Sequence, residues 1–324
     1  MTRTGGVSVL LLTKNGRAYL GELLESVKAQ DGWSQSCEII AVDSGSRDGT
    51  LEILGRFGAR VVRIPAAEFS HGRTRNLAAG QAKGEYLVFL TQDATPANAR
   101  WLARLLSPLR EDAEIAGAYS RHLPRPRCHP MEWRRIVEME FSGRPDSSVN
   151  RAVGNPDYGG NPAFFYFFSN VSSALRRTVW ERFPFPEVEF GEDQLWARRV
   201  LEQGYKTAYC ADSLVFHSHG YGPWANFRRH FDHARAFRDV SGRRPPQVAL
   251  GTLARAAVSA AADDLRFWRR ERGQSKYRVW FRWGAPALGW HLAALLGTWV
   301  GERSGKLPCW SVGLLSYHER IKRQ

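Results

Sequence analysis

The sequence predicts an α/β protein with a mixed, mostly parallel sheet and flanking helices, followed by a basic helical region. Two observations predict the sheet: short apolar runs alternate with amphipathic stretches, and polar clusters follow directly after the runs. A third observation predicts the helical region, because the composition becomes basic and aromatic after Gly220. We expect an α/β domain over 1–220, with halves of about 1–120 and 121–220, and a helical region over 221–324.

The elements follow in order along the chain. Buried strands are predicted at four apolar runs, 7–12, 37–42, 60–64 and 86–90. Helices are predicted at 19–27, 51–57, 74–82 and 192–203. The stretch 121–162 is rich in Pro, Gly and Arg and has little periodicity, which predicts a long functional loop or lid. A regular pattern resumes at 164–168, and 213–216 reads as a short strand.

The charge is concentrated in one part of the chain. The whole chain of 324 residues carries +14, and the segment 221–324 holds 19 Lys or Arg against 7 Asp or Glu. The same segment holds 7 of the 12 tryptophans. A basic, aromatic segment suits either nucleic acid or an anionic bilayer surface.

The cysteines and the N-terminus bear on the compartment. Four cysteines lie far apart without metal-ligand spacing: Cys37, Cys128, Cys210 and Cys309. We expect them to be reduced thiols in the cytosol. The apolar run 7–12 is too short for the core of a signal peptide, so we expect none.

Two acidic residues end predicted strands. Ligands of parallel sheets bind at the carboxyl ends of strands, where Asp43 and Asp93 fall. Asp43 fits a contact to the sugar or base of a nucleotide, or a plain turn in which Asp48 caps the next helix. Asp93 fits a divalent ion on a diphosphate, or an N-cap for a helix over 97–106.

Cations gather where the third predicted helix begins. The stretch 69–76 groups His71, two arginines and Asn76 near a helix N-terminus. Helix N-termini attract phosphate, and the helix dipole disfavours cations there unless they have another use. This stretch predicts a phosphate contact, with an ordinary basic first turn as the alternative.

Two further groups could carry chemistry. Glu192 and Asp193 lie at the start of a predicted helix. One of them could be the general base for an acceptor hydroxyl, or both could interact favourably with the helix dipole. His217 and His219 follow a short strand, where one of them could bind a metal or both could be structural.

In this order, the motifs resemble those of the inverting family 2 glycosyltransferases of the GT-A fold, and in particular bacterial rhamnosyltransferases that build surface polysaccharide. The resemblance covers roughly residues 7–220. Each motif is weak alone, and their order and spacing make them specific. The matching stretches are Val9–Asn15, Val42–Thr50, Phe69–Asn76, Val88–Ala94, Ser169–Asn170, Gly191–Trp196 and Val215–His219.

The resemblance implies a role for particular positions. The residues implied to bind the nucleotide sugar are Thr13, Asn15, Asp43, Ser44, His71, Arg75, Asn76, Gln92 and Asp93. Asp93 is the surviving acid of the family's Asp-X-Asp motif, implied to hold Mn²⁺ or Mg²⁺ with His217. Thr91 replaces the first acid of that motif, so we expect a lower affinity for the metal. Asp193 is implied to be the catalytic base, with Glu192 beside it. The residues implied to meet the acceptor are Asn170, Trp196 and His219.

The resemblance also implies an activity. It implies transfer of a sugar, with rhamnose from dTDP-rhamnose favoured, to a glycan or polyprenyl-linked glycan in O-antigen-type synthesis at the cytoplasmic face of the membrane. Galactofuranose or glucose stays open as the sugar, and so does an inactive sugar-binding scaffold. A nucleic-acid-binding protein explains the charge but not Asp43, Asp93 and Asp193, because carboxylates repel phosphate. We expect no nucleic acid partner and leave a homo-oligomer open.

The stretch 284–301 contains no charged residue and is bordered by Trp and Arg. Its 18 residues lie at the lower limit for a membrane span, and it contains Pro286. Trp and Arg at both ends suit the headgroup layer. A re-entrant or in-plane segment is therefore favoured over a span or over a core or oligomer-forming helix.

Overall fold

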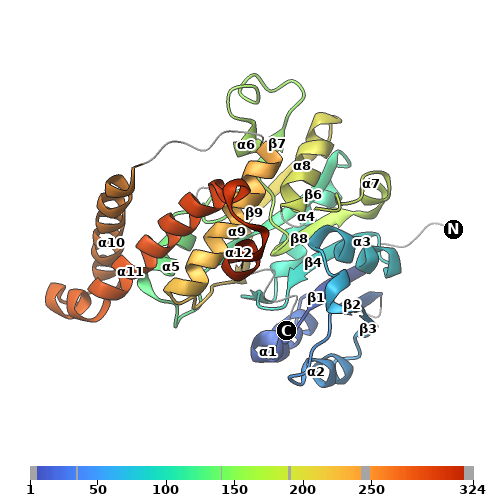
Figure 1. The fold of residues 1–324 in the computed structure, drawn as a ribbon. Helices are drawn as coiled ribbons and strands as arrows, with labels where there is room; N and C mark the ends of the chain where they lie inside the picture. The colour runs from blue at the N-terminus through green and yellow to red at the C-terminus, as the bar shows by residue number, and fades with distance from the viewer. Residues whose placement is uncertain (1–5, 34–35, 140, 189–190, 242–248, 317–324) are drawn as a thin grey trace. The chain divides into compact units, whose positions relative to one another are not determined.

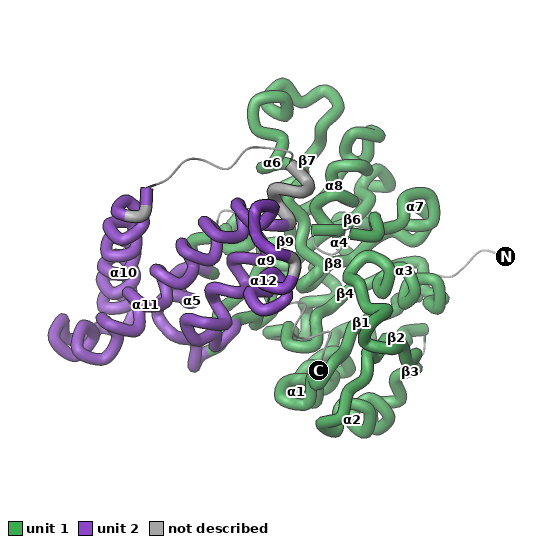
Figure 2. The backbone as a smooth tube through the Cα atoms, in the orientation of Figure 1, with its two compact units in different colours: residues 1–125, 136–218 green, residues 126–135, 219–324 purple. Residues whose placement is uncertain are grey.

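The computed structural model describes residues 6–33, 36–139, 141–188, 191–241 and 249–316. The chain divides into two compact units, 1–125 with 136–218 and 126–135 with 219–324 (Figure 2). The sequence placed a boundary at 220, and the structure adds the short segment 126–135 to the second unit. Two stretches of the basic region, 242–248 and 317–324, lie outside the described residues.

The described part of the first unit holds a nine-stranded mixed sheet (Figure 1). The strand order is β3-β2-β1-β4-β8-β6-β9-β5, and β7 pairs with β9. The strands are β1 (Val7–Thr13), β2 (Cys37–Asp43), β3 (Arg60–Arg63), β4 (Tyr86–Thr91), β5 (Thr95–Pro96), β6 (Ile115–Leu123), β7 (Ser148–Arg151), β8 (Ser172–Arg176) and β9 (Lys206–Phe216).

The register of the sheet brings three strand ends together. Strands β3, β2, β1 and β4 are parallel, with Thr13 opposite Asp43 and Leu12 opposite Thr91. Strand β8 runs antiparallel to β4 and starts beside its end, because Ser172 lies opposite Leu90. The carboxyl ends of β1, β2 and β4 therefore share one edge of the sheet, as the sequence predicted.

Helices cover both faces of the sheet. They are α1 (Arg17–Lys28), α2 (Thr50–Arg56), α3 (His71–Gln81), α4 (Trp101–Glu111), α6 (Pro162–Phe165), α7 (Arg177–Arg182) and α8 (Glu192–Glu202), with a 3₁₀ turn η1 (Ala66–Glu68). Side chains of a strand alternate between its faces, so Val9 and Leu10 enter different core clusters. Helices α1 and α4 pack in the Val9 cluster, and α3 and α8 in the Leu10 cluster.

Most of the predicted elements are confirmed. The structure adds strands β5, β6, β7 and β8, and it extends the strand predicted at 213–216 to Lys206–Phe216. The stretch 121–162 is not one long loop, since it contains the end of β6, helix α5 (Pro130–Val137) and β7. Strand β8 was not predicted because its sequence, Ser-Ser-Ala-Leu-Arg, lacks an apolar run. Its buried hydroxyl of Ser172 is accommodated by Ser120, 2.7 Å away, and by the Trp101 indole N–H.

The second unit is helical. It holds α9 (Pro223–Ser241), α10 (Leu250–Arg272), α11 (Lys276–Glu302), α12 (Cys309–Leu315), a 3₁₀ turn η2 (Ser304–Lys306) and most of α5. Helix α11 packs tightly against α9 at two glycines. A Cβ added at Gly297 would lie 2.2 Å from the Phe227 carbonyl oxygen, and one at Gly301 2.4 Å from that of Phe231.

The uncharged stretch 284–301 lies inside the continuous helix α11. The re-entrant form of the prediction is wrong, because the chain does not reverse within this helix, and the in-plane form stays a prediction. One side of this stretch packs within the second unit, where Ala287, Trp290 and Ala294 are buried. No helix in the described part of the chain combines the length and apolar character that crossing a bilayer requires.

Candidate active site

The acid at the end of β2 is enclosed by donors. The carboxylate of Asp43 accepts from the hydroxyls of Thr13 (2.9 Å) and Ser46 (2.5 Å), and from the backbone N–H groups of Gly45 (3.0 Å) and Ser46 (2.9 Å). The side chain is completely buried, and Thr13 and Ser44 beside it are buried too. Asp43 therefore shapes the turn after β2, in place of the base or ribose contact that the sequence predicted.

A second set of hydrogen bonds fixes the loop after β1. The Gln92 side-chain amide accepts from the Lys14 N–H (2.9 Å) and donates to the Lys14 carbonyl (3.1 Å). A Cβ at Gly16 would lie 2.5 Å from the Gln92 amide oxygen, so only glycine leaves room for this pairing. Asn15 is exposed, has a φ of 50°, and accepts from the Arg47 N–H (3.0 Å). These contacts give Gln92 a role in positioning the loop, and Asn15 remains a candidate for the nucleotide.

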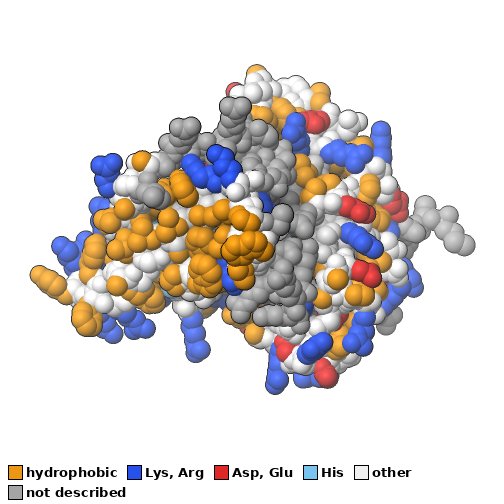
Figure 3. All heavy atoms as spheres, in the orientation of Figure 1, with side chains coloured by type: hydrophobic (Ala, Val, Ile, Leu, Met, Phe, Trp, Pro, Cys, Tyr) orange, Lys and Arg blue, Asp and Glu red, His pale blue; other side chains and the backbone are white. Residues whose placement is uncertain are grey.

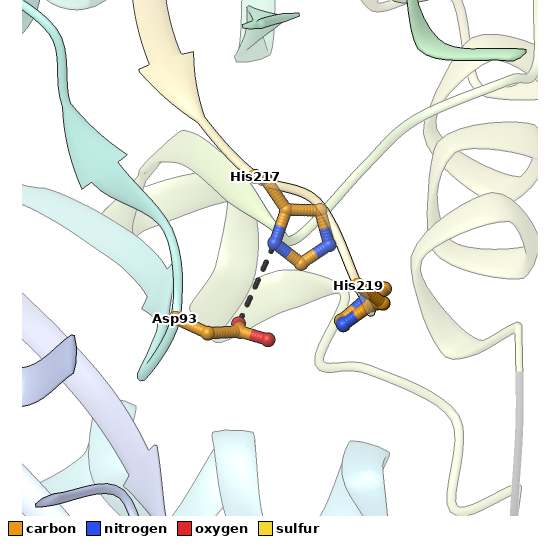
Figure 4. A group of neighbouring side chains, drawn as sticks. All are labelled: Asp93, His217 and His219. Atoms are coloured by element: carbon orange, nitrogen blue, oxygen red, sulfur yellow. Dashed lines mark ion pairs between the residues drawn. The ribbon is translucent and has the colours of Figure 1, made fainter. Parts of the chain in front are cut away.

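The acid after β4 has a different environment. The Asp93 carboxylate lies 3.5 Å from Nδ1 of His217, which follows β9 (Figure 4). Helix α4 begins at Trp101 with Arg100 at its N-cap, so Asp93 caps no helix there. The alternative interpretation of Asp93 is therefore excluded, and its carboxylate faces an imidazole.

Asp93 and His217 form a donor set that suits a divalent metal. Together with His219, their ligand atoms lie within 4.8 Å of one another, and only Ser218 separates the two histidines along the chain (Figure 4). Carboxylate and imidazole groups are both ligands of divalent metal ions in proteins. The hydroxyl of Thr91 is buried and has no hydrogen-bond partner within the described residues. A polar atom without a protein partner at this strand end fits a bound ion or phosphate oxygen.

At the start of α8, one of two neighbouring acids is neutralised by the protein. Glu192 is buried and accepts from Nη1 of Arg75 (2.5 Å) and from the Asn170 side-chain amide (3.4 Å). Arg75 is itself buried, and His71 Nδ1 lies 3.3 Å from its guanidinium. The structure thus uses Arg75 to hold Glu192, and the predicted contact of Arg75 with the diphosphate stays a prediction.

The other acid of the pair, Asp193, accepts hydrogen bonds from backbone groups and not from a cation within the described residues. Its carboxylate accepts backbone N–H groups from Asn170 (3.1 Å) and Gln194 (2.9 Å). Burial raises the pKa of Asp193 to about 7, the adjacent Glu192 carboxylate adds to this rise, and Arg75 opposes it. A carboxylate with a pKa near neutrality is suited to accept a proton at physiological pH.

One short segment connects the two acids that are candidates for chemistry. The Asn170 N–H donates to Asp193, and the next residue, Val171, accepts from the Thr91 N–H through its carbonyl (3.0 Å). Thr91 is two residues before Asp93. Asp193 and the end of β4 are therefore joined through residues 170–171.

Two predicted site residues have structural roles instead. Trp196 is fully buried, donates its indole N–H to the Phe183 carbonyl (2.8 Å) and packs on Phe168, so the prediction that it meets an acceptor is corrected. Asn76 donates to the Phe185 carbonyl and accepts from the Phe185 N–H. Both residues stabilise the segment that leads into α8 because their polar atoms face its backbone.

The structure adds one residue that the sequence did not single out. Arg125 donates to the Asp93 carbonyl oxygen (3.1 Å) and to the Thr95 hydroxyl (2.7 Å). Its guanidinium also lies over the Tyr19 ring, 4.2 Å from the centroid. Arg125 thus positions the segment that carries Asp93. Only its place in an Arg-rich stretch hinted at this role.

The sequence of the chain matches a known family. The model of glycosyl transferase family 2 matches residues 8–170, which is half of the chain. The chain belongs to glycosyl transferase family 2. This family 2 chain is 35% identical over 202 residues to the O-antigen chain rhamnosyltransferase WbaN of Salmonella anatum, covering 61% of this chain. It spans 62% of WbaN, which is less than two thirds of that protein.

A second relative is matched over a longer stretch. The chain is 31% identical over 230 residues to the O-antigen chain rhamnosyltransferase RfbN of Salmonella typhimurium. The match covers 70% of each protein.

Solved structures resemble this family 2 chain in fold. The mannosyltransferase PcManGT from Pyrobaculum calidifontis, solved with GDP-Man and Mn²⁺, has a TM-score of 0.58 at 19% identity, covering 93% of this chain and 88% of that one. TarS 1–349 of S. aureus, solved with UDP, has a TM-score of 0.53 at 17% identity, covering 93% and 91%. At these identities the likeness concerns the fold, and the predicted GT-A fold is confirmed.

Proposed function

We propose that this family 2 chain is an inverting rhamnosyltransferase that uses dTDP-rhamnose and a glycan or polyprenyl-linked glycan acceptor in surface polysaccharide synthesis. The names of WbaN and RfbN support rhamnose as the sugar. The observation that carries the proposal is the placement of Asp193. Its pKa is raised to about 7, and residues 170–171 join it to the strand end that presents Asp93.

The proposed reaction is a single displacement. Asp193 accepts the proton of the acceptor hydroxyl while that oxygen forms a bond to the anomeric carbon. The bond from this carbon to the diphosphate oxygen breaks, and the electron pair leaves with the nucleoside diphosphate. Because the new bond forms on the side opposite the leaving group, the configuration inverts. Glu192 and Arg75 hold the start of α8 in place, so that Asp193 meets the acceptor hydroxyl.

A divalent ion belongs beside the leaving diphosphate. Asp93 and His217 would hold it, with His219 as a further candidate ligand, and it would stabilise the negative charge on the leaving group. Mn²⁺ accompanies GDP-Man in the PcManGT structure, which supports Mn²⁺ as the first ion to test. Thr91 stands where the family motif has its first acid, so we expect weaker metal binding than two carboxylates would give.

We also propose where the enzyme acts. A polyprenyl-linked acceptor is confined to a bilayer, and the segment 221–324 combines basic residues with seven tryptophans. Both points support peripheral attachment to the cytoplasmic face of the membrane. A homo-oligomer is left open.

A panel of nucleotide sugars tests the proposed activity. Purified full-length chain with Mn²⁺ should hydrolyse or transfer from dTDP-rhamnose faster than from UDP-glucose or UDP-galactofuranose. Asp193→Asn should remove the turnover while donor binding, measured by calorimetry, persists. Preference for another donor would contradict rhamnose as the sugar and leave the proposed transferase activity in place. Binding of every donor without turnover under any condition would favour a sugar-binding scaffold.

A further inference from the structure

The tip of the α10–α11 hairpin is unusually basic and aromatic. Residues 266–282 carry seven Lys or Arg against one Glu. Helix α10 ends with three arginines in its last turn and Gly273 in the left-handed conformation, and α11 begins after Ser275. Neither the proposed displacement nor the GT-A fold explains this concentration of charge at the end of a hairpin.

A groove lies between the two helices of this hairpin. It has a volume of about 370 Å³, and the residues that line it are Ala262, Leu265, Arg266, Arg269, Lys276 and Trp280. Its floor is apolar, and three of its six lining residues are cations. Arg266 pairs with Asp263, whereas Arg269 and Lys276 have no acidic partner within the described residues. Cations beside an apolar floor suit a ligand that carries both a phosphate group and a hydrocarbon chain.

Large aromatic side chains project next to the groove. Tyr277 is 86% exposed and Phe281 96% exposed, and both lie on one side of α11 because they are four residues apart. Figure 3 shows hydrophobic side chains gathered over the helical unit, with Lys and Arg side chains along its margin. Exposed aromatics of this size mark a surface that binds another apolar body.

We propose that the α10–α11 hairpin tip is the membrane-docking element of the chain, and that its groove binds the phosphate headgroup of an anionic lipid. Arg269 and Lys276 contact the headgroup, while Tyr277 and Phe281 insert at the boundary with the acyl chains. This inference rests on the proposed action at a membrane surface and names the residues that make the contact. Charge complementarity selects the occupant, because basic residues beside exposed aromatics match the headgroup layer of an anionic bilayer.

Vesicle binding by the full chain tests the proposal. Vesicles of phosphatidylglycerol and phosphatidylcholine should bind the chain, and vesicles of phosphatidylcholine alone should bind it far less. Arg269→Gln should weaken binding about fivefold at an ionic strength of about 0.1 M, the effect of removing one basic residue near an anionic surface. Phe281→Ser should weaken it about tenfold or more, and this loss should persist at high salt because it is apolar.

Matched controls lie on the same hairpin. Arg255 is an exposed arginine of α10, 14 residues before Arg269, or roughly 21 Å along the helix. This separation exceeds the screening length of about 8–10 Å, so Arg255→Gln should bind vesicles like the unchanged chain. Val258→Ser, at an exposed apolar position of α10, is the control for Phe281→Ser.

Three outcomes would overturn the proposal. The first is an equal loss of vesicle affinity in Arg255→Gln and Arg269→Gln, which would indicate that the net charge of the unit binds the membrane and that no specific site does. The second is a dimer, seen by sedimentation without vesicles, that Phe281→Ser dissociates. The third is binding of an RNA oligonucleotide that requires Arg269 and that added vesicles do not compete with. Turnover of dTDP-rhamnose with a water-soluble acceptor should be unchanged in Arg269→Gln and Phe281→Ser, so failure of docking is distinguishable from failure of the proposed activity.

Discussion

Two pairs of acids at the carboxyl edge of the sheet differ in what surrounds their carboxylates. Asp43 accepts four hydrogen bonds and Glu192 is paired with a buried arginine. Asp193 accepts two backbone N–H groups, and Asp93 faces an imidazole. A carboxylate enclosed by donors or paired with a buried arginine stabilises the fold, whereas one that lies beside an imidazole or accepts from backbone N–H groups is the better candidate to bind a metal or accept a proton. The sequence assigned all four to the active site, and their surroundings separate them.

Removal of Asp193 should have the largest effect on activity. Asp193→Asn keeps the size of the side chain and one of the two backbone contacts, because one oxygen remains, but it cannot accept a proton. We expect turnover to fall by about 10²- to 10⁴-fold with little change in donor affinity. Initial rates at saturating dTDP-rhamnose measure the first quantity, and calorimetry measures the second. Near-normal turnover in Asp193→Asn would place the base elsewhere.

Removal of Asp93 should act through the metal. Asp93→Ala should abolish the stimulation of transfer by Mn²⁺ and weaken Mn²⁺ binding by about tenfold or more, because an imidazole alone replaces a carboxylate-imidazole pair. Mn²⁺ titration followed by electron paramagnetic resonance measures the affinity without any turnover. Asp212→Ala, at an exposed carboxylate, is the matched control. Unchanged Mn²⁺ affinity in Asp93→Ala would contradict the assignment of Asp93 as a metal ligand.

Removal of Asp43 should affect stability. Asp43→Ala leaves buried donors without a partner, and each such donor costs about 1–3 kcal/mol. We expect the free energy of unfolding to fall by roughly 3 kcal/mol or more, as measured by urea denaturation monitored by circular dichroism. An Asp43→Ala variant with an unchanged free energy of unfolding and a lower affinity for the nucleotide would contradict the structural role given to Asp43.

The sequence predicts the scaffold well because apolar runs set the buried strands. Strands β1, β2 and β4 fall where Val7–Leu12, Cys37–Val42 and Tyr86–Leu90 predicted them. Strand β8 could not be predicted, because the hydroxyl of its buried Ser172 forms hydrogen bonds to residues far along the chain. Local patterning carries no information about such partners.

The candidate site was predicted less completely for the same reason. Asp93, His217 and Asp193 were identified from strand and helix ends, and the structure places Asp93 beside His217. Arg75, Asn76 and Trp196 were assigned to ligands, whereas their partners are Glu192, Phe185 and Phe183. Residue type and position along an element do not reveal whether a polar group is already occupied by a distant part of the chain.

The pH dependence of turnover tests the role of Asp193 most directly. An aspartate accepts a proton only when it is ionised, and the pKa of Asp193 is raised to about 7. Turnover should therefore fall as the pH drops below about 7. Glu192→Gln removes the neighbouring negative charge that helps to raise this pKa, so the acid limb should move to lower pH by about one unit. A limb that stays in place in Glu192→Gln, or a profile that is flat between pH 5 and 8 in the unchanged chain, would contradict the assignment of Asp193 as the base.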